Sequence, residues 1–268
     1  MKKLMALLLA VAMVASLTAC GSKAEDASAG AANGTITFAT NAEFPPFEFI
    51  SSNGVIGEFD GIDMAMAKMI AEDNGMEAKM ENMEFDSLLI ALQNGQIDAV
   101  IAGMTVTDER KETVDFSTPY YTATQVMIVK EDSDIAKATD MEGKKIAVVQ
   151  GYTGEVCVND LGYSYEAFKK GTECIMELVN GKCDVVVLDS ATASKYVADN
   201  EGLKIVEDTE AFGAEEYAIA VAKGNTELLD KINASIEKLL ADGTVSELAV
   251  KYTAVSYTHL TLPTTSLV

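Results

Sequence analysis

Two segments of the chain repeat one pattern of residue types, and this repeat limits the possible folds more than any other feature. Residues 92–103 read LQNGQIDAVIAG and residues 178–189 read LVNGKCDVVVLD. Each segment reads as the end of a helix, an Asn-Gly stop, a loop aspartate and a short buried strand. Because a solenoid needs three or more units, a single recurrence favours two lobes of like architecture.

Strand-like and helix-like segments alternate from residue 35 onward, which is typical of an α/β fold with mainly parallel sheets. The repeat places Gly103 and Asp189 at equivalent strand ends, and open α/β sheets bind ligands at the carboxyl ends of their strands. Two facing lobes would therefore put these residues on opposite walls of one cleft. We expect strands at 35–40, 97–102, 145–149, 185–188 and 217–222, and helices at 62–73, after a cap at Asp86, and at 225–242.

The first 34 residues read as an export signal followed by an anchor. Lys2 and Lys3 precede an apolar stretch at 4–17, which is shorter than the roughly 20 residues of a bilayer span. Residues 17–20 (LTAC) resemble a bacterial lipobox, in which the cysteine is diacylated and becomes the first residue. We expect a signal peptide at 1–19, a lipid anchor at Cys20 and a flexible tether at 20–34.

The end of the chain differs from the body. Residues 255–268 (VSYTHLTLPTTSLV) carry no Lys, Arg, Asp or Glu and resemble the translation of a sequencing adapter. We expect an artefact there rather than a native β-rich tail. The only histidine, His259, lies in this tail, which argues against His-based triads and His-rich metal sites in the body.

Charge and cysteine content exclude several kinds of partner and site. The chain has 20 Lys and Arg against 42 Asp and Glu, a net charge of −22. Nucleic acid is a poor partner for such a chain, because phosphate binding needs a basic face. Besides Cys20, an odd set remains (Cys157, Cys174 and Cys183), which allows at most one internal disulfide. Their spacing fits neither a zinc ribbon nor a C-x-x-C pair, so small semi-buried residues are favoured.

A further group of motifs follows in a fixed order. They are ATNAEFPPFEF (39–49), GIDMAMAK (61–68), GMTVTDERK (103–111), VDFSTPYY (114–121), VQGYTG (149–154) and LD (188–189). Together they resemble the polar amino-acid solute-binding proteins of ABC importers, bacterial extracellular solute-binding family 3, over about residues 35–252. One departure is Ala65, where the family has a second aspartate.

This resemblance implies a two-lobed periplasmic-binding-protein fold, in which each lobe has a mixed, mainly parallel sheet flanked by helices around a ligand cleft. Lobe 1 would comprise 35–122 and 216–254 and lobe 2 would comprise 123–215, with hinges near 121–124 and 212–217. The implied protein is a monomer on the outer face of the cell membrane that delivers its ligand to importer membrane subunits. No metal, nucleotide or prosthetic group is implied.

The two ends of a free amino acid have candidate partners. Arg110, the only arginine of the body, offers a planar fork for a carboxylate, unless it forms an exposed helix ion pair with Glu109 or Asp108. Asp189 suits the ammonium, helped by the Gly103 carbonyl and the Thr105 hydroxyl. The alternative for Asp189 is a cap on the following helix.

Further candidates surround these two charges. Gln150, Thr153 and Gly154 lie where a strand turns into a helix, so free N–H groups there could add to carboxylate binding. By resemblance, Phe44 and Phe85 would sandwich the ligand side chain; otherwise they are core aromatics.

The distal end of the ligand could be recognised beside Phe44. Asn41 and Glu43 lie there, and Glu43 would favour a cationic side chain such as arginine or lysine, unless strand alternation turns it to solvent. A binding protein, not an enzyme, is expected, because the body has no histidine and the amino-acid signature is intact. The alternatives are a cyclohexadienyl-type dehydratase with Glu43 as general acid, or a sensor module that presents its ligand to a separate receptor.

Overall fold

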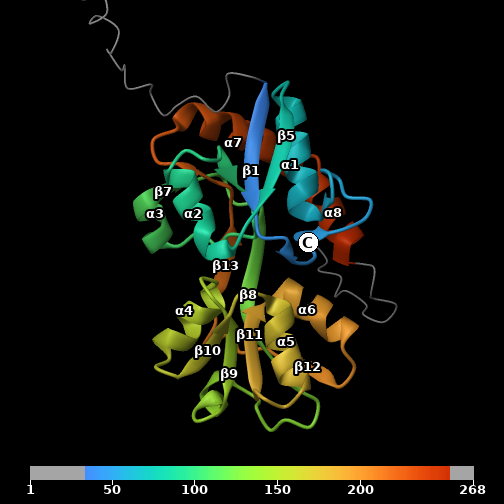
Figure 1. Ribbon diagram of the computed structural model, residues 1–268, viewed down its shortest axis with the longest axis vertical. Helices are drawn as coiled ribbons and strands as arrows, with labels where there is room; N and C mark the ends of the chain where they lie inside the picture. Colours follow the sequence, from blue (N-terminus) through green and yellow to red (C-terminus); the bar gives the residue numbers. More distant parts are fainter. Residues whose placement is uncertain (1–33, 254–268) are drawn as a thin grey trace, which may run out of the picture.

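The computed structural model describes residues 34–253 and divides them into two α/β lobes, which lie one above the other in Figure 1. The expected signal peptide, Cys20, the tether before residue 34 and the adapter-like tail lie outside the described residues. Within 34–253, no helix is long and apolar enough to cross a membrane.

Lobe 1 contains a five-stranded mixed sheet and a small antiparallel sheet. The larger sheet runs in the order β5 (Glu77–Asn82), β1 (Thr35–Thr40), β6 (Ala99–Val100), β14 (Ala220–Ala222) and β7 (Val114–Phe116). The smaller one runs β2 (Glu43–Phe44), β3 (Glu48–Ile50) and β4 (Phe59–Asp60). The helices of this lobe are α1 (Ile62–Asp73), α2 (Phe85–Gln93), α3 (Asp108–Thr113), α7 (Thr226–Ala241) and α8 (Thr244–Thr253). Of these, α1, α7 and α8 pack on one another.

Lobe 2 has a sheet of the same design. Its strands run in the order β10 (Tyr165–Phe168), β9 (Ile146–Val149), β11 (Val185–Asp189), β8 (Tyr121–Lys130) and β12 (Leu203–Val206). Its helices are η1 (Ala138–Met141), α4 (Thr153–Asp160), α5 (Gly171–Val179) and α6 (Ser190–Asp199). On β11, Val186 and Leu188 pack into one core while Val185 and Val187 pack into another. Burial on both faces explains why this strand reads as a continuous apolar run.

The two lobes are joined through an antiparallel ladder between β8 and β13 (Ala214–Tyr217). Residues 121–124 of β8 pair with β13, and the rest of β8 continues into the lobe 2 sheet. In Figure 1 these strands run through the waist of the molecule. The ladder includes all of the predicted hinge at 121–124 and residues 214–217 of the predicted hinge at 212–217.

The repeat in the sequence corresponds to equivalent units in the two lobes. Gly95 after α2 and Gly181 after α5 both have positive φ, 67° and 70°, so each ends its helix in a conformation that favours glycine. The loop aspartates also match. Asp98 Oδ2 accepts from the N–H of Thr37 at 2.8 Å, and Asp184 Oδ2 accepts from the N–H of Lys145 at 2.8 Å. The predicted two-lobed α/β fold is confirmed.

Local details differ from the expectations. Each large sheet has as many antiparallel as parallel pairings, because β14 in lobe 1 and β8 in lobe 2 run against their neighbours. The helix expected after Asp86 begins at Phe85, with Glu84 at the N-cap position. Asp86 lies in its first turn, and its carboxylate contacts Lys169 of lobe 2 at 2.7 Å.

Candidate ligand-binding site

One cavity lies between the lobes at the carboxyl ends of β6 and β11. It is nearly closed, with a volume of about 10 Å³, so a molecule larger than a water could enter only if the lobes moved apart. Of the predicted site residues, the cavity is lined by Phe44, Phe85, Gly103, Thr105, Arg110, Thr153 and Asp189. Ala102 and Tyr152 also line it and were not predicted.

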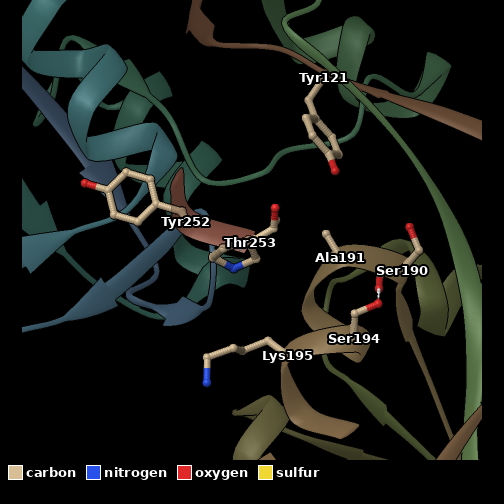
Figure 2. Close-up of a pocket in the computed structure, with 8 residues that line it drawn as sticks. Tyr121, Ser190, Ala191, Ser194, Lys195, Tyr252 and Thr253 are labelled. Carbon is tan, nitrogen blue, oxygen red and sulfur yellow. Dashed lines mark hydrogen bonds between the residues drawn. The ribbon is translucent and has the colours of Figure 1, made fainter. Parts of the chain in front are cut away.

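A larger pocket, of about 240 Å³, lies elsewhere between the lobes. Figure 2 shows Ser190, Ser194 and Lys195 of α6 facing Tyr121, Tyr252 and Thr253 across it. The Ser194 hydroxyl donates to the carbonyl of Ser190 and the Lys195 ammonium pairs with Asp199. This pocket contains none of the predicted site residues, and its lining has no carboxylate to oppose the lysine. The smaller cavity is therefore the candidate site.

Asp189 provides a buried carboxylate in the cavity wall. It ends β11 and is only 3 % exposed. Its Oδ1 accepts a hydrogen bond of 2.5 Å from the Tyr217 hydroxyl, and its side chain makes no capping bond to α6. Burial, reinforced by the charge of Glu215, raises the pKa of Asp189 to about 7 against the lowering effect of its hydrogen bonds from Tyr217 and Gln125.

Arg110 provides a half-buried cation from lobe 1. Helix α3 begins after Thr107, whose hydroxyl accepts from the Arg110 N–H at 3.2 Å. The guanidinium donates to the Thr105 carbonyl at 2.6 Å and, across the cleft, to the Gly151 carbonyl at 3.0 Å. It lies 5.3 Å from the centre of the Phe85 ring. The alternative of an exposed ion pair is not what the structure shows, since Asp108 contacts Lys111 instead.

Glu215, on the ladder between the lobes, accepts hydrogen bonds from the hydroxyl groups next to Asp189 and Arg110. Its Oε2 accepts from Thr105 at 2.9 Å, from Thr153 at 2.7 Å and from the Gln125 side chain at 3.2 Å. The Thr105 hydroxyl therefore donates its proton to Glu215, although its oxygen remains at the cavity. The sequence analysis missed Glu215 and Gln125, because nothing local marks a hinge carboxylate as facing a distant strand end.

An aromatic group forms another wall of the cavity. The Tyr152 ring stands edge-on to both phenylalanines, 5.3 Å from the Phe44 centroid and 4.6 Å from that of Phe85. Tyr152 belongs to the 149–154 motif, in which only its neighbours were considered for their backbone groups. An aromatic residue in a strand-to-helix turn was the available signal.

The remaining candidates lie outside the cavity lining. The Asn41 side chain donates to the Met83 carbonyl at 3.0 Å and accepts from the Tyr152 hydroxyl at 3.0 Å. Glu43 pairs with Lys170 of lobe 2 at 2.7 Å. Gln150 is exposed and its N–H donates to the Phe168 carbonyl.

Gly154, in the first turn of α4, also lies outside the lining, and its role is one of packing. A Cβ at this position would lie 2.8 Å from the Val187 carbonyl oxygen and 2.9 Å from the Gln125 amide oxygen. The start of α4 can therefore approach β11 only with glycine here. The helix begins at Thr153, so the first N–H groups of α4, which have no partner within the helix, lie beside the cavity.

Among residues 34–253, no group of His, Cys, Asp and Glu side chains could hold a metal ion. Cys157, Cys174 and Cys183 are free thiols; Cys157 is half-buried, as predicted, whereas Cys174 and Cys183 are more deeply buried than predicted. A half-buried cation and a buried carboxylate on opposite lobes, beside an aromatic wall, are complementary to a small zwitterion.

Comparisons with known proteins agree with this geometry. The model of the bacterial extracellular solute-binding proteins, family 3, matches residues 36–255. A probable histidine-binding protein of Neisseria gonorrhoeae is 36 % identical over 263 residues, covering 95 % of this chain and 96 % of that protein. The arginine-binding extracellular protein ArtP of Bacillus subtilis is 31 % identical over 259 residues, covering 94 % of this chain and 98 % of that protein.

Solved structures give the same result. A mutant of ArgBP from T. maritima superposes with a TM-score of 0.76 at 40 % identity, covering 83 % of this chain and 96 % of that one. An ancestral arginine-binding protein bound to glutamine gives a TM-score of 0.76 at 44 % identity, covering 82 % and 97 %. The chain therefore belongs to the bacterial extracellular solute-binding proteins of family 3.

Proposed function

We propose that the protein captures a polar amino acid between its lobes and delivers it to an ABC importer, with a cationic amino acid as the preferred ligand. The observation that carries this proposal is the placement of half-buried Arg110 and buried Asp189 in the walls of one interlobe cavity. Arg110 would hold the ligand carboxylate by charge-assisted hydrogen bonds, and Asp189 would hold the ammonium.

Binding would proceed by closure of the lobes about the β8–β13 ladder. The described conformation is closed, and several polar contacts already cross the cleft, such as Arg110 to Gly151, Tyr152 to Asn41 and Lys170 to Glu43. A ligand that touches both walls adds contacts only in the closed form, so it shifts the population toward that form. The closed form would then be the one recognised by importer subunits.

The preference for a cation is supported by the relatives and by the cavity wall. The relatives reported above are named for arginine or histidine, and ArtJ from Geobacillus stearothermophilus is described as an arginine-, lysine- and histidine-binding protein. A cationic side chain among Phe44, Phe85 and Tyr152 would gain cation–π attraction. A neutral ligand such as glutamine is the second candidate, because an ancestral arginine-binding protein was found with glutamine bound.

The location of the protein follows from the same proposal. We infer that Cys20, in its lipobox-like context, anchors the protein by lipid to the outer face of the cell membrane. An extracytoplasmic position would place the cleft where nutrients arrive and the importer can accept them.

A melting-temperature screen with the twenty amino acids tests the proposed function. A ligand at a hundredfold excess over its dissociation constant adds about 2.7 kcal/mol to the free energy of unfolding, or roughly 5 to 10 °C for a protein of this size. We expect the largest rise with arginine, lysine or histidine and a smaller one with glutamine. If no amino acid raises the melting temperature, the proposed function is wrong, and dehydratase activity on a cyclohexadienyl acid would be assayed next.

The role of Glu43 can be tested separately. Because its carboxylate pairs with Lys170 outside the cavity lining, Glu43→Gln should weaken arginine and glutamine binding alike, by less than about fivefold, as expected for a half-exposed ion pair. Isothermal titration calorimetry with both ligands gives the comparison. Asp86→Asn, which removes the other lysine–carboxylate pair across the cleft, is the matched control. A loss of arginine affinity much larger than the loss for glutamine would instead make Glu43 the reader of positive charge.

A further inference from the structure

Two fully buried carboxyl groups lie behind the cleft wall of lobe 1 and have no place in the proposed binding contacts. They belong to Glu48 on β3 and Asp63 in the first turn of α1, both 0 % exposed. Neither lines the cavity, and no ion pair joins either to a cation within residues 34–253. Buried carboxylates without a cation are costly, so the pair requires an explanation.

The start of α1 brings the two groups together. Gly61 approaches the Pro46–Phe47 segment so closely that a Cβ would lie 2.1 Å from the Phe47 carbonyl oxygen. The N–H groups of Ile62 and Asp63 then donate to the carbonyls of Pro46 and Phe47 at 3.1 and 3.0 Å. This docking places the first turn of α1 beside the residue that follows Phe47.

The hydrogen bonds of the two groups are unequal. Asp63 Oδ2 accepts from the Gly103 N–H at 2.8 Å and from the Tyr120 hydroxyl at 2.8 Å. Asp63 Oδ1 and both carboxyl oxygens of Glu48 accept no hydrogen bond from any other residue among those described. A proton on Glu48, donated to Asp63, would give Asp63 Oδ1 a donor and leave one oxygen of Glu48 without one.

The proton belongs on Glu48. Asp63 accepts two hydrogen bonds and lies at a helix N-terminus, which favours its charged form. Burial first, then the charge of Asp63, raises the pKa of Glu48 well above its usual value. Burial raises the pKa of Asp63 to about 7, opposed by its bonds from Gly103, Tyr120 and Glu48. The other charge that acts on Glu48 is that of Asp189, in the facing wall.

The Gly103 N–H that donates to Asp63 belongs to a residue of the cavity wall. Gly103 has φ of 51°, and a Cβ there would lie 2.5 Å from the Phe44 ring. Gly103 therefore donates its N–H to Asp63 and also packs closely against the Phe44 ring. A small shift of Gly103 would move both its own carbonyl and the aromatic wall.

We propose that Glu48 and Asp63 are positioning residues of the ligand site, in which protonated Glu48 holds Asp63 and Asp63 holds Gly103 against Phe44. The effect of the Glu48–Asp63 pair on amino-acid affinity rests on the function proposed above. The effect of the pair on Gly103 does not. The pair acts through Gly103 and touches no ligand.

The test compares an isosteric variant with a truncating one. Glu48→Gln keeps a donor toward Asp63, so arginine and glutamine affinities at pH 7.5 should stay within about threefold of the parent, whereas Glu48→Ala leaves Asp63 without that donor and should weaken both by about tenfold. The control is Asp98→Asn, which replaces a loop carboxylate of the same lobe and weakens the hydrogen bond that this carboxylate accepts from the Thr37 N–H. It should lower the melting temperature and leave affinity within about threefold. If Glu48→Ala behaves like this control, or if Glu48→Gln binds as weakly as Glu48→Ala, the proposal is overturned.

A second measurement needs no amino acid. The amide resonance of Gly103, followed by NMR in the ligand-free protein, should shift with pH around 7 as Asp63 titrates. Glu48→Gln should keep this titration, Asp63→Asn should reduce it to the contribution of Asp189, whose pKa is also about 7, and Glu48→Ala should displace the resonance at every pH. A Gly103 resonance that is unchanged in all three variants would overturn the proposal even if ligand binding is intact. If no amino acid binds the parent protein, the proposed function fails, while this titration still decides the role of the pair.

Discussion

Replacing Arg110 by lysine should weaken amino-acid binding by about 100-fold or more, because the planar guanidinium would no longer hold the ligand carboxylate by two hydrogen bonds. The guanidinium already bridges the two lobes, with one nitrogen on the Thr105 carbonyl and another on the Gly151 carbonyl. It retains further N–H donors for a ligand in the cavity. The single nitrogen of lysine cannot reach both carbonyls and also grip a carboxylate in a planar fork. Stacking on Phe85 would be lost as well.

Isothermal titration calorimetry with arginine and with glutamine would measure this loss. Lys111→Gln is a suitable control, because Lys111 lies next along α3 and carries a half-exposed charge that pairs with Asp108 at the surface. The control should bind both ligands within about threefold of the parent, as expected for an exposed pair. An Arg110→Lys protein that also binds within that range would remove Arg110 from the carboxylate site.

The fold could be predicted because its determinants are local. Gly95 and Gly181 end their helices with positive φ, and Asp98 and Asp184 cap the loops that follow. Each of these roles depends on a few neighbouring residues, so each leaves a pattern in the sequence. Strand direction does not, because it depends on which distant segments become neighbours, and the equal share of antiparallel pairings was not foreseen.

The charged ends of the site could also be predicted. Arg110 is the only arginine of the body, and Asp189 follows an apolar strand, so both are unusual where they stand. The contacts of Asn41 and Glu43 could not be predicted, because their partners, Tyr152 and Lys170, lie 111 and 127 residues away and belong to the other lobe. Lobe closure brings these residues together.

The buried acids were the hardest to foresee. Glu48 lies two residues from the exposed Ile50 in a motif that looks like part of a surface hairpin. Its burial results from the docking of α1, which the sequence shows only through the glycine at 61. Glu215 is hidden in the same way within the hinge ladder. A titratable residue leaves no local pattern when its environment is built by remote segments.

Asp189→Asn should weaken ligand binding while it raises the free energy of unfolding. Asparagine can still accept a hydrogen bond from the Tyr217 hydroxyl, so the fold should persist, but it offers no charge to the ligand ammonium. We expect affinity at pH 8 to fall by about 100-fold, in line with the cost of removing one partner of a buried charged contact. In the parent protein affinity should rise with pH up to about 7 and then level off, since the ammonium selects ionised Asp189. The variant should lose most of this dependence.

The free energy of unfolding without ligand should change in the other sense. The pKa of Asp189 is about 7 when folded, against about 3.9 in an unfolded chain. Between these values the folded state holds a proton that the unfolded state has released, so this group costs about 1.4 kcal/mol per pH unit as pH rises. Asp189→Asn removes that cost. Urea unfolding should therefore find the variant more stable than the parent at pH 8, with the difference vanishing near pH 4. The control is Asp184→Asn, whose loop carboxylate accepts from the Lys145 N–H and which should lose stability at pH 8. A destabilised Asp189→Asn protein at pH 8 would mean that Asp189 serves the fold rather than the ligand.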